Sequence, residues 1–254
     1  MCYLISPILC LVWPILACAQ NWEEQHLFNA DAPGPKLRIL SSTDTSVFAP
    51  LITQFVAKNP TVPVEYLVTG TATIDEIFRA NPTDYDLVVS SAMDLQLKLT
   101  NDGLALRIDD LSHPPWAQWR QSLFAFTSEP ATIVVNTSAF SHGNIPKTRQ
   151  ALIKAMRARP EEFRGRVGTY DIRRSGLGYL FATQDARASD TFWRLMEVLG
   201  HLDVRLYCCS GDMIRDLENG KIAVATMCWA AMRRHKSNTM TRSKSFCPLT
   251  FRQP

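Results

Sequence analysis

Apolar residues in the first part of the chain alternate between a strand pattern and a helix pattern, and this unit occurs three times. In the first unit, residues 37–40 predict a buried strand, and apolar positions at helical spacing over 48–56 predict an amphipathic helix. The second and third units begin with strands at 64–68 and 86–89. Three strand-turn-helix units predict a parallel sheet with helices packed on its faces.

Each of these strands is followed by a turn rich in serine and threonine, at 41–46, 69–73 and 90–91. The carboxyl ends of parallel strands meet along one rim of a sheet, where ligands bind, so we expect the three turns to be neighbours in a polar cleft. Pro50 places the first helix start near Ser46, with free backbone N–H groups beside the hydroxyls. The alternative that these hydroxyls only cap helices stays open.

Two of the turns also carry the spacing of a helix cap. Thr73 with Glu76, and Ser91 with Asp94, each place an acidic residue three positions after a hydroxyl. We therefore expect the second and third helices to start near Thr73 and Ser91.

The second half of the chain continues the α/β pattern after a break. The segment 124–130 leads into an apolar strand at 132–135, and we interpret it as a crossover between two lobes. The elements expected after it are a helix at 147–159 with its basic residues outward, a strand at 165–170, helices from Tyr179 and at 189–199 and 212–219, and strands at 204–207 and 222–225.

The loop 171–178 has the parts of an anion site. Ser175 and Gly176 stand at a predicted helix start and follow Arg173 and Arg174, so backbone donors, a hydroxyl and a forked cation come together. The predicted ligand-binding residues are therefore Ser42, Thr43, Thr45, Gly70, Thr71, Ser90 and Ser91 from the first lobe, and Arg173, Arg174, Ser175 and Gly176 from the second. We expect Arg174 to supply the charge, with Arg173 as the alternative.

Composition excludes several classes of protein. The chain has 254 residues, of which 46% are hydrophobic, so it can bury a substantial core and is not disordered. A net charge of +3 without a basic, aromatic-interleaved stripe argues against nucleic acid. There is no nucleotide-binding glycine loop, no HExxH and no GxSxG, so we expect no enzyme, no catalytic residue and no cofactor.

Cysteine spacing predicts no metal site. Cys208, Cys209, Cys228 and Cys247 lack metal-ligand spacing. Adjacent residues of a strand point to opposite faces, so Cys208 and Cys209 are expected to be two buried small hydrophobic residues.

The first residues predict export. Residues 1–19 form an apolar run closed by Ala17-Cys18-Ala19, as in a signal peptide cleaved after Ala19, although no Lys or Arg precedes the run. A lipoprotein with Cys18 as the lipidated residue is the alternative. Residues 20–35 lack periodicity and are predicted to be a flexible leader.

The motifs together resemble a known family. The segments that carry the likeness are Leu37–Ser42, Asp86–Ser91, Phe126–Ala131, Ile133–Asn136, Gly168–Asp171 and Ser175–Gly178. They are similar to the periplasmic solute-binding proteins of ABC transporters, in the type 2 subgroup near the ferric-iron and phosphonate binders. Ferric binders carry adjacent tyrosines as iron ligands, and no such pair occurs here, so the resemblance does not extend to iron.

The resemblance implies a two-lobed α/β fold, with lobe 1 at 36–128 and lobe 2 at 129–225, that closes about a hinge near 127–131. It implies a monomer that captures a small anionic solute in the periplasm for a membrane permease. The alternative within the family is a regulatory component that signals a solute such as phosphoglycerate to a membrane sensor kinase.

The tail at 226–254 departs from the family pattern. Members continue with a segment such as Asn-Val-Leu-Gly-Ser-Tyr, and codons for it read one nucleotide late encode Met-Cys-Trp-Ala-Ala-Met, the run at 227–232. We therefore expect a shifted reading frame, a tail without strands, and an incomplete second lobe that exposes apolar surface. A natural disordered basic tail is the alternative.

Overall fold

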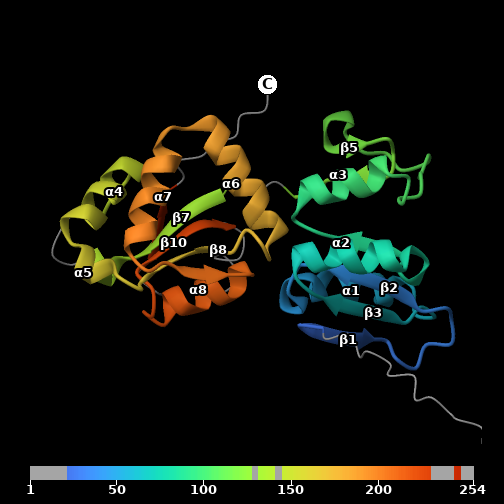
Figure 1. The fold of residues 1–254 in the computed structure, drawn as a ribbon. Helices are drawn as coiled ribbons and strands as arrows, with labels where there is room; N and C mark the ends of the chain where they lie inside the picture. Colours follow the sequence, from blue (N-terminus) through green and yellow to red (C-terminus); the bar gives the residue numbers. More distant parts are fainter. Residues whose placement is uncertain (1–21, 128–130, 141–144, 230–242, 247–254) are drawn as a thin grey trace, which may run out of the picture.

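A computed structural model describes residues 22–127, 131–140, 145–229 and 243–246. They form two α/β lobes that stand side by side (Figure 1). The predicted signal peptide at 1–19, including Cys18, lies outside the described residues, as do residues 128–130 of the predicted hinge and most of the predicted tail.

The first lobe is built on a sheet with the strand order β1-β3-β2-β4. Strand β2 pairs in parallel with both β3 and β4, which confirms the predicted parallel sheet, and β1 adds an antiparallel edge to β3. The elements of this lobe are β1 (Glu24–Phe28), β2 (Leu37–Ser41), α1 (Thr45–Lys58), β3 (Val64–Val68), α2 (Thr71–Ala80), η1 (Pro82–Asp84), β4 (Leu87–Val89), α3 (Met93–Asn101), η2 (Pro115–Ala117), β5 (Gln118–Trp119) and β6 (Leu123–Phe124).

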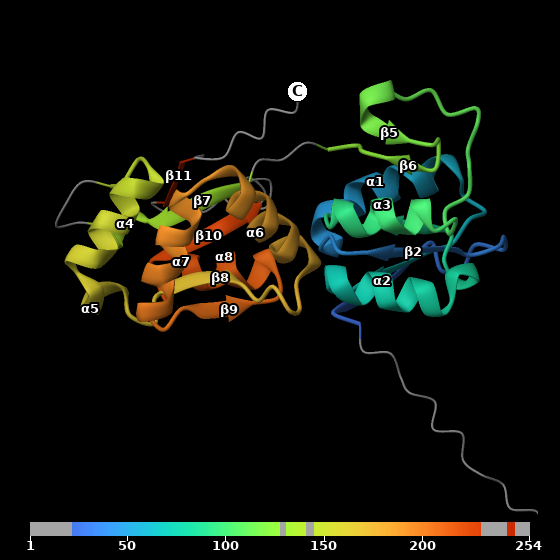
Figure 2. The same cartoon turned by 45° about the horizontal axis from the view of Figure 1, so that its top comes forward.

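Alternation along the strands divides the core of this lobe between the two faces of the sheet. Ile39 packs with Ile52 of α1 on one face, whereas its neighbour Leu40 packs with residues of α2 and α3 such as Ile74 and Leu99 on the other. The β5–β6 hairpin lies next to α3 (Figure 2). Both faces of the sheet are therefore covered, as a parallel sheet requires.

The prediction of a flexible leader at 20–35 is wrong for its middle part. Residues Glu24–Phe28 form β1, whose partners run from Val68 back to Val64. The strand was missed because it is an edge strand with exposed residues at its centre, so it lacks the apolar alternation of a buried strand.

The second lobe is built on a sheet with the strand order β11-β7-β10-β8-β9. Strands β10, β8 and β9 are parallel, and β7 runs antiparallel to both β10 and β11. The elements are β7 (Ala131–Asn136), η3 (Thr137–Phe140), α4 (Arg149–Ala158), α5 (Pro160–Phe163), β8 (Val167–Tyr170), α6 (Gly176–Ala188), α7 (Thr191–His201), β9 (Arg205–Tyr207), α8 (Ser210–Glu218), β10 (Val224–Trp229) and β11 (Ser243–Phe246).

A buried ion pair joins helices of this lobe. Arg149 was expected on an outward basic face of its helix, but its side chain is 5% exposed and forms two hydrogen bonds to Asp185 of α6, at 2.9 and 2.6 Å. It also donates to the Thr191 hydroxyl at the start of α7. The helix pattern could not show this, because the partner that satisfies Arg149 lies 36 residues away.

The structure also differs from the expected tail without strands. Strand β10 continues beyond the predicted boundary at 225 to Trp229, and Ser243–Phe246 pairs with Ile133–Asn136 as β11. The shifted reading frame stays a prediction, since most of the tail lies outside the described residues.

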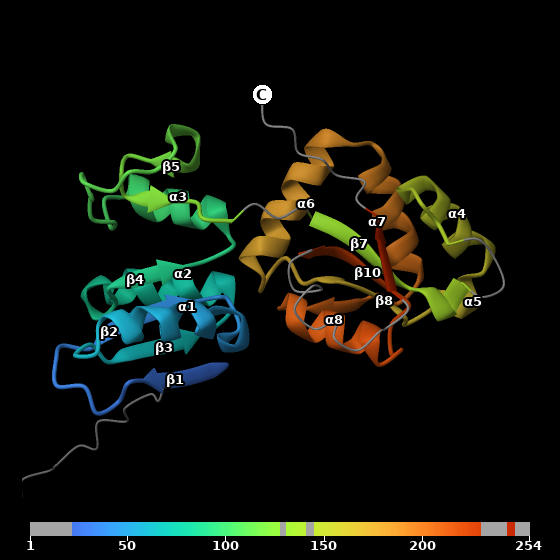
Figure 3. The same ribbon diagram turned by 180° about the vertical axis from the view of Figure 1, so that it is seen from behind.

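The two lobes meet through α6. This helix lies beside α2 and α3 of the first lobe, in views from the front and from behind (Figures 1 and 3). The carboxyl ends of strands of the first lobe and the start of α6 are therefore brought to a common interface.

Candidate functional site between the lobes

The three hydroxyl-rich turns of the first lobe are neighbours on one rim of its sheet. The backbone N–H of Ser42 donates to the carbonyl of Val89 at 2.9 Å, and the N–H of Ser91 donates to the Ser42 hydroxyl at 3.2 Å. On the other side, the N–H of Thr69 donates to the carbonyl of Ser41 at 3.0 Å. The expected juxtaposition of the turns is confirmed, because β2 lies between β3 and β4.

A buried tyrosine that sequence reasoning missed holds the first turn. The Tyr66 hydroxyl lies 2.7 Å from the Ser41 hydroxyl and 2.9 Å from the carbonyl oxygen of Thr43. The N–H of Thr43 donates to the same Ser41 hydroxyl at 3.0 Å. Burial raises the pKa of Tyr66, so the phenol remains a neutral donor. This network fixes the backbone of the turn beside the interface.

The expected anion position at the start of α1 is already taken by a carboxylate of the chain. The backbone N–H of Thr45 donates to Glu24 Oε2 at 2.8 Å. The Glu24 carboxylate therefore interacts with the N-terminus of α1, where a solute was expected to bind. The prediction at Thr45 failed to include Glu24 because β1 was not recognised as a strand.

The expected helix caps at Thr73 and Ser91 are wrong. Helix α2 starts at Thr71 after Gly70, and α3 starts at Met93. Ser90 instead accepts a hydrogen bond from the N–H of Ala92 at 3.2 Å. The residues at the two N-cap positions are Gly70 and Ala92, and neither helix start has a side-chain cap hydrogen bond.

The start of α6 confirms the predicted helix terminus at Ser175 and Gly176. The Ser175 hydroxyl accepts from the N–H of Gly178 at 3.1 Å and caps the helix. The N–H of Leu177, one residue before Gly178, donates across the interface to the Thr71 hydroxyl at 3.2 Å. The predicted Thr71 of the first lobe is therefore in direct contact with the first turn of α6 in the second lobe.

The two predicted arginines differ in whether their guanidinium groups are already paired within the protein. Arg173 forms a forked pair with Asp171, with its Nε and Nη2 atoms 2.8 and 2.9 Å from the carboxylate oxygens. Hydrogen bonds from Arg173 lower the pKa of Asp171, so this carboxylate stays charged. Arg174 is exposed, and its side chain forms no hydrogen bond or ion pair within the described part of the chain. Of the two arginines, Arg174 is thus the one whose guanidinium group is not paired with Asp171.

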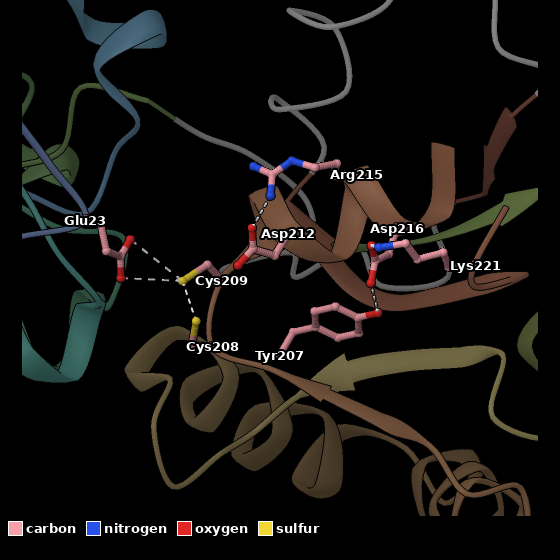
Figure 4. A network of polar contacts seen from close by, with 8 residues as sticks. All are labelled: Glu23, Tyr207, Cys208, Cys209, Asp212, Arg215, Asp216 and Lys221. Atoms are coloured by element: carbon pink, nitrogen blue, oxygen red, sulfur yellow. Dashed lines mark hydrogen bonds and ion pairs between the residues drawn. The ribbon is translucent and has the colours of Figure 1, made fainter. Parts of the chain in front are cut away.

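The expectation that Cys208 and Cys209 are hydrophobic residues on opposite faces of a strand is wrong. Strand β9 ends at Tyr207, and Cys209 precedes α8, so the backbone turns and brings the two Sγ atoms within 2.7 Å. The two thiols are free and half-buried. Glu23 of the first lobe faces them, with its carboxylate oxygens 3.7 and 3.9 Å from Cys209 Sγ (Figure 4).

This corner of the interface is electrically negative. Desolvation, together with the nearby carboxylates of Asp212, Asp44 and Glu24, raises the pKa of Glu23, and a hydrogen bond from Cys209 opposes that rise. Burial, the neighbouring Cys208 and the charges of Glu23 and Asp212 raise the pKa of Cys209. Two regions therefore share the interface: a donor-rich one at Thr71 and α6, and an acidic, thiol-bearing one at Glu23.

Within the described residues, no helix is both long enough and apolar enough to cross a membrane. In the same residues, Glu23, Cys208 and Cys209 form the group of potential metal ligands whose atoms lie close together.

Solved structures share this architecture. The chain has the two-lobed α/β fold of the periplasmic substrate-binding proteins of ABC transporters, which confirms the predicted resemblance. It superposes with a TM-score of 0.84 on the substrate-binding protein of an ABC transporter from Agrobacterium tumefaciens, at 28% identity, over 89% of this chain and 69% of that one.

Two further structures are more distant in sequence. The periplasmic binding protein AfuA from Actinobacillus pleuropneumoniae, with fructose-6-phosphate bound, gives a TM-score of 0.66 at 13% identity over 83% of this chain and 68% of that one. A two-component system protein that mediates signal transduction gives a TM-score of 0.64 at 14% identity, over 84% of this chain and 70% of that one. No protein-family model and no curated protein sequence matches the chain.

Proposed function

We propose that the chain is a solute-binding protein of the periplasm and not an enzyme. It captures a small anionic solute between its lobes and delivers the solute to a membrane permease. The observation that carries the proposal is the contact between the Thr71 hydroxyl and the N–H of Leu177, because it unites a hydroxyl-rich rim with a helix N-terminus. Such a terminus favours negative charge.

The donors around this contact suit a phosphate or carboxylate. Ser90, Ser91 and Thr71 supply hydroxyls from the first lobe, and Arg174 supplies an open guanidinium from the second. Arginine pairs with phosphate and carboxylate through two parallel hydrogen bonds. AfuA, which holds a sugar phosphate on the same fold, is a precedent for an anionic solute.

The acidic corner at Glu23 limits where an anion can lie. Because carboxylates there repel a negative ligand, the solute's charged group is placed at the start of α6, and its neutral part toward Gly70. Thr45 is excluded as an anion contact because the acceptor on its N–H is the Glu24 carboxylate, which repels a negative ligand.

A regulatory role is the second candidate. The similarity in fold to a two-component system protein favours a component that reports a solute, such as phosphoglycerate, to a membrane sensor kinase. Both roles use the same site and differ in the membrane partner. Permease and ATPase genes beside this gene favour transport, whereas a histidine kinase gene favours signalling.

The anion proposal is tested first by thermal shift of the full chain with inorganic phosphate, 3-phosphoglycerate and fructose 6-phosphate, with fructose as the neutral control. A ligand at 100 times its Kd stabilises the folded state by about 2.7 kcal/mol. We expect at least one anion to raise Tm and fructose to leave it unchanged. Stabilisation by fructose alone would contradict an anion site.

Calorimetry of arginine variants then locates the charge contact. A charge-assisted hydrogen bond contributes roughly 1.5–3 kcal/mol, so Arg174→Ala should weaken binding at least about tenfold. Arg173→Ala should have a smaller effect, because Asp171 already holds its fork. Arg187→Ala, which changes an exposed arginine in the last turn of α6, the helix that follows Arg173 and Arg174, is the control. Equal affinity in all three variants would remove Arg174 from the site.

A further inference from the structure

Cys208 and Cys209 lie where the second lobe meets the start of the first. They follow β9 directly, and Cys209 precedes the first residue of α8. Figure 4 shows the sulfur of Cys209 pointing toward Glu23, which stands just before β1. The partners are 186 residues apart in sequence, so only the docked lobes bring them together.

The distances suit a shared cation. One ligand atom from each of the three side chains lies within 4.8 Å of the others. Ligand atoms around a tetrahedral zinc ion lie roughly 3.5–3.8 Å apart, given Zn–S and Zn–O bonds of about 2.3 and 2.0 Å. The 3.7 Å between Cys209 Sγ and Glu23 Oε1 already fits this spacing.

The two sulfurs need only a small adjustment. Their separation is 2.7 Å, and both are free cysteines. It is about 1 Å shorter than the separation expected of two ligands on one zinc ion. Rotation of the Cys208 side chain, which is half-buried and not locked in a core, can open that distance.

We propose that Glu23, Cys208 and Cys209 form a binding site for a thiophilic divalent cation of the zinc class that bridges the two lobes. Thiolate ligands select zinc and similar soft ions over calcium or magnesium, which prefer oxygen. Three protein ligands leave a fourth position for water. The thiol protons are released to solvent when the ion binds, and no electron is transferred.

The surroundings favour a positive ion. Asp212, in the first turn of α8, and Asp44 add negative charge: Asp212 acts on both Glu23 and Cys209, and Asp44 acts on Glu23. Asp212 itself is held by Arg215 at 2.6 Å, so it contributes charge from the edge of the site rather than a free ligand. A bound cation would relieve the mutual repulsion of these groups.

This inference does not depend on the anionic solute. The cation site lies beside Gly70, where an added Cβ would be 3.7 Å from Glu23 Oε1, whereas the charged part of the solute is assigned to the start of α6. The two sites use different side chains and are measured by separate titrations, so failure of the cation site is distinguishable from failure of the anion proposal.

The test is metal titration of the reduced full chain with Zn²⁺ by calorimetry and with Co²⁺ by absorption. We expect one zinc ion per chain and a thiolate-to-cobalt charge-transfer band. Cys208→Ser and Cys209→Ser should each weaken zinc binding at least about tenfold and diminish the band. Glu23→Gln should weaken zinc binding at least about tenfold while the band persists, because both thiolates remain.

The control is the double variant Cys228→Ser/Cys247→Ser, which removes two other cysteines and should bind zinc as the unaltered chain does. Circular dichroism melting of every variant separates loss of a ligand from loss of the fold. Loss of the band in the control variant, or its retention at full strength in Cys208→Ser and Cys209→Ser, would overturn the site. Unchanged zinc affinity in Glu23→Gln would overturn the bridge between the lobes.

Discussion

Tyr66 is the residue on which the geometry of the first turn depends. Its hydroxyl contacts both Ser41 and the Thr43 carbonyl in a buried setting. Tyr66→Phe leaves these polar groups without that partner, which should lower the free energy of unfolding by about 1–3 kcal/mol. Urea denaturation measures the change, with Tyr179→Phe, an exposed tyrosine, as the control. An equal effect of both variants would show that the buried hydroxyl contributes nothing specific.

At the scale of single residues, the sequence predicted donors better than it predicted their partners. Thr71 and Gly176 were predicted from different lobes, and they face each other at the interface, where a Cβ added at Gly176 would lie 3.3 Å from the Thr71 hydroxyl. Their part in ligand binding stays a prediction. The partners of Thr45 and Cys209, which are Glu24 and Glu23, could not be predicted. They come from a segment without apolar periodicity, so nothing marked it as part of the sheet.

Among the elements, the pair of Arg149 with Asp185 connects α4 to α6, the helix that contacts the other lobe. Loss of one partner from a buried ion pair costs about 3–5 kcal/mol, because the other charge stays buried. We expect this loss for Arg149→Met, and recovery of most of it in Arg149→Met/Asp185→Leu. Chemical denaturation provides the measurement.

The matched control for this pair is Arg157→Met on the same helix. Arg157 pairs with Glu197 at the surface, where such pairs contribute roughly 0–1 kcal/mol. If Arg149→Met cost no more than Arg157→Met, the buried pair would not hold the helices together.

Elements with a buried apolar pattern were predicted well, and edge elements were not. The strand at 64–68 was placed with its observed bounds because all five of its residues are buried. Strand β1 is exposed at its centre, and β11 follows a segment with no strand pattern. Helix α8 starts at Ser210, two residues before the predicted Asp212.

In the whole molecule, the packing of α6 against the first lobe sets the distance between the lobes. A Cβ added at Gly176 would lie 2.8 Å from Leu95 Cδ1 and 3.2 Å from Ala92 Cβ, both in the first lobe. Gly176→Leu should therefore hold the lobes apart and weaken solute binding at least about tenfold, since closure is needed to complete the site. Gly200→Leu, where an added Cβ meets nothing within 4 Å, is the control.

Two lobes could be predicted from the sequence, but their interface could not. The lobes follow from two sets of strand-turn-helix units separated by a crossover. The contact between Thr71 and Leu177 joins residues 106 positions apart, and no local pattern reports such a distance. The candidate site therefore depends on how the lobes dock, which no local sequence pattern predicts.

The central claim, that the lobes close around an anionic solute, is tested most directly by small-angle X-ray scattering. The radius of gyration of the full chain is measured with and without whichever of phosphate, 3-phosphoglycerate or fructose 6-phosphate raises Tm. We predict compaction of the unaltered chain and of Gly200→Leu on saturation, and no compaction of Gly176→Leu. Identical profiles with and without solute in the unaltered chain, or full compaction of Gly176→Leu, would contradict the account.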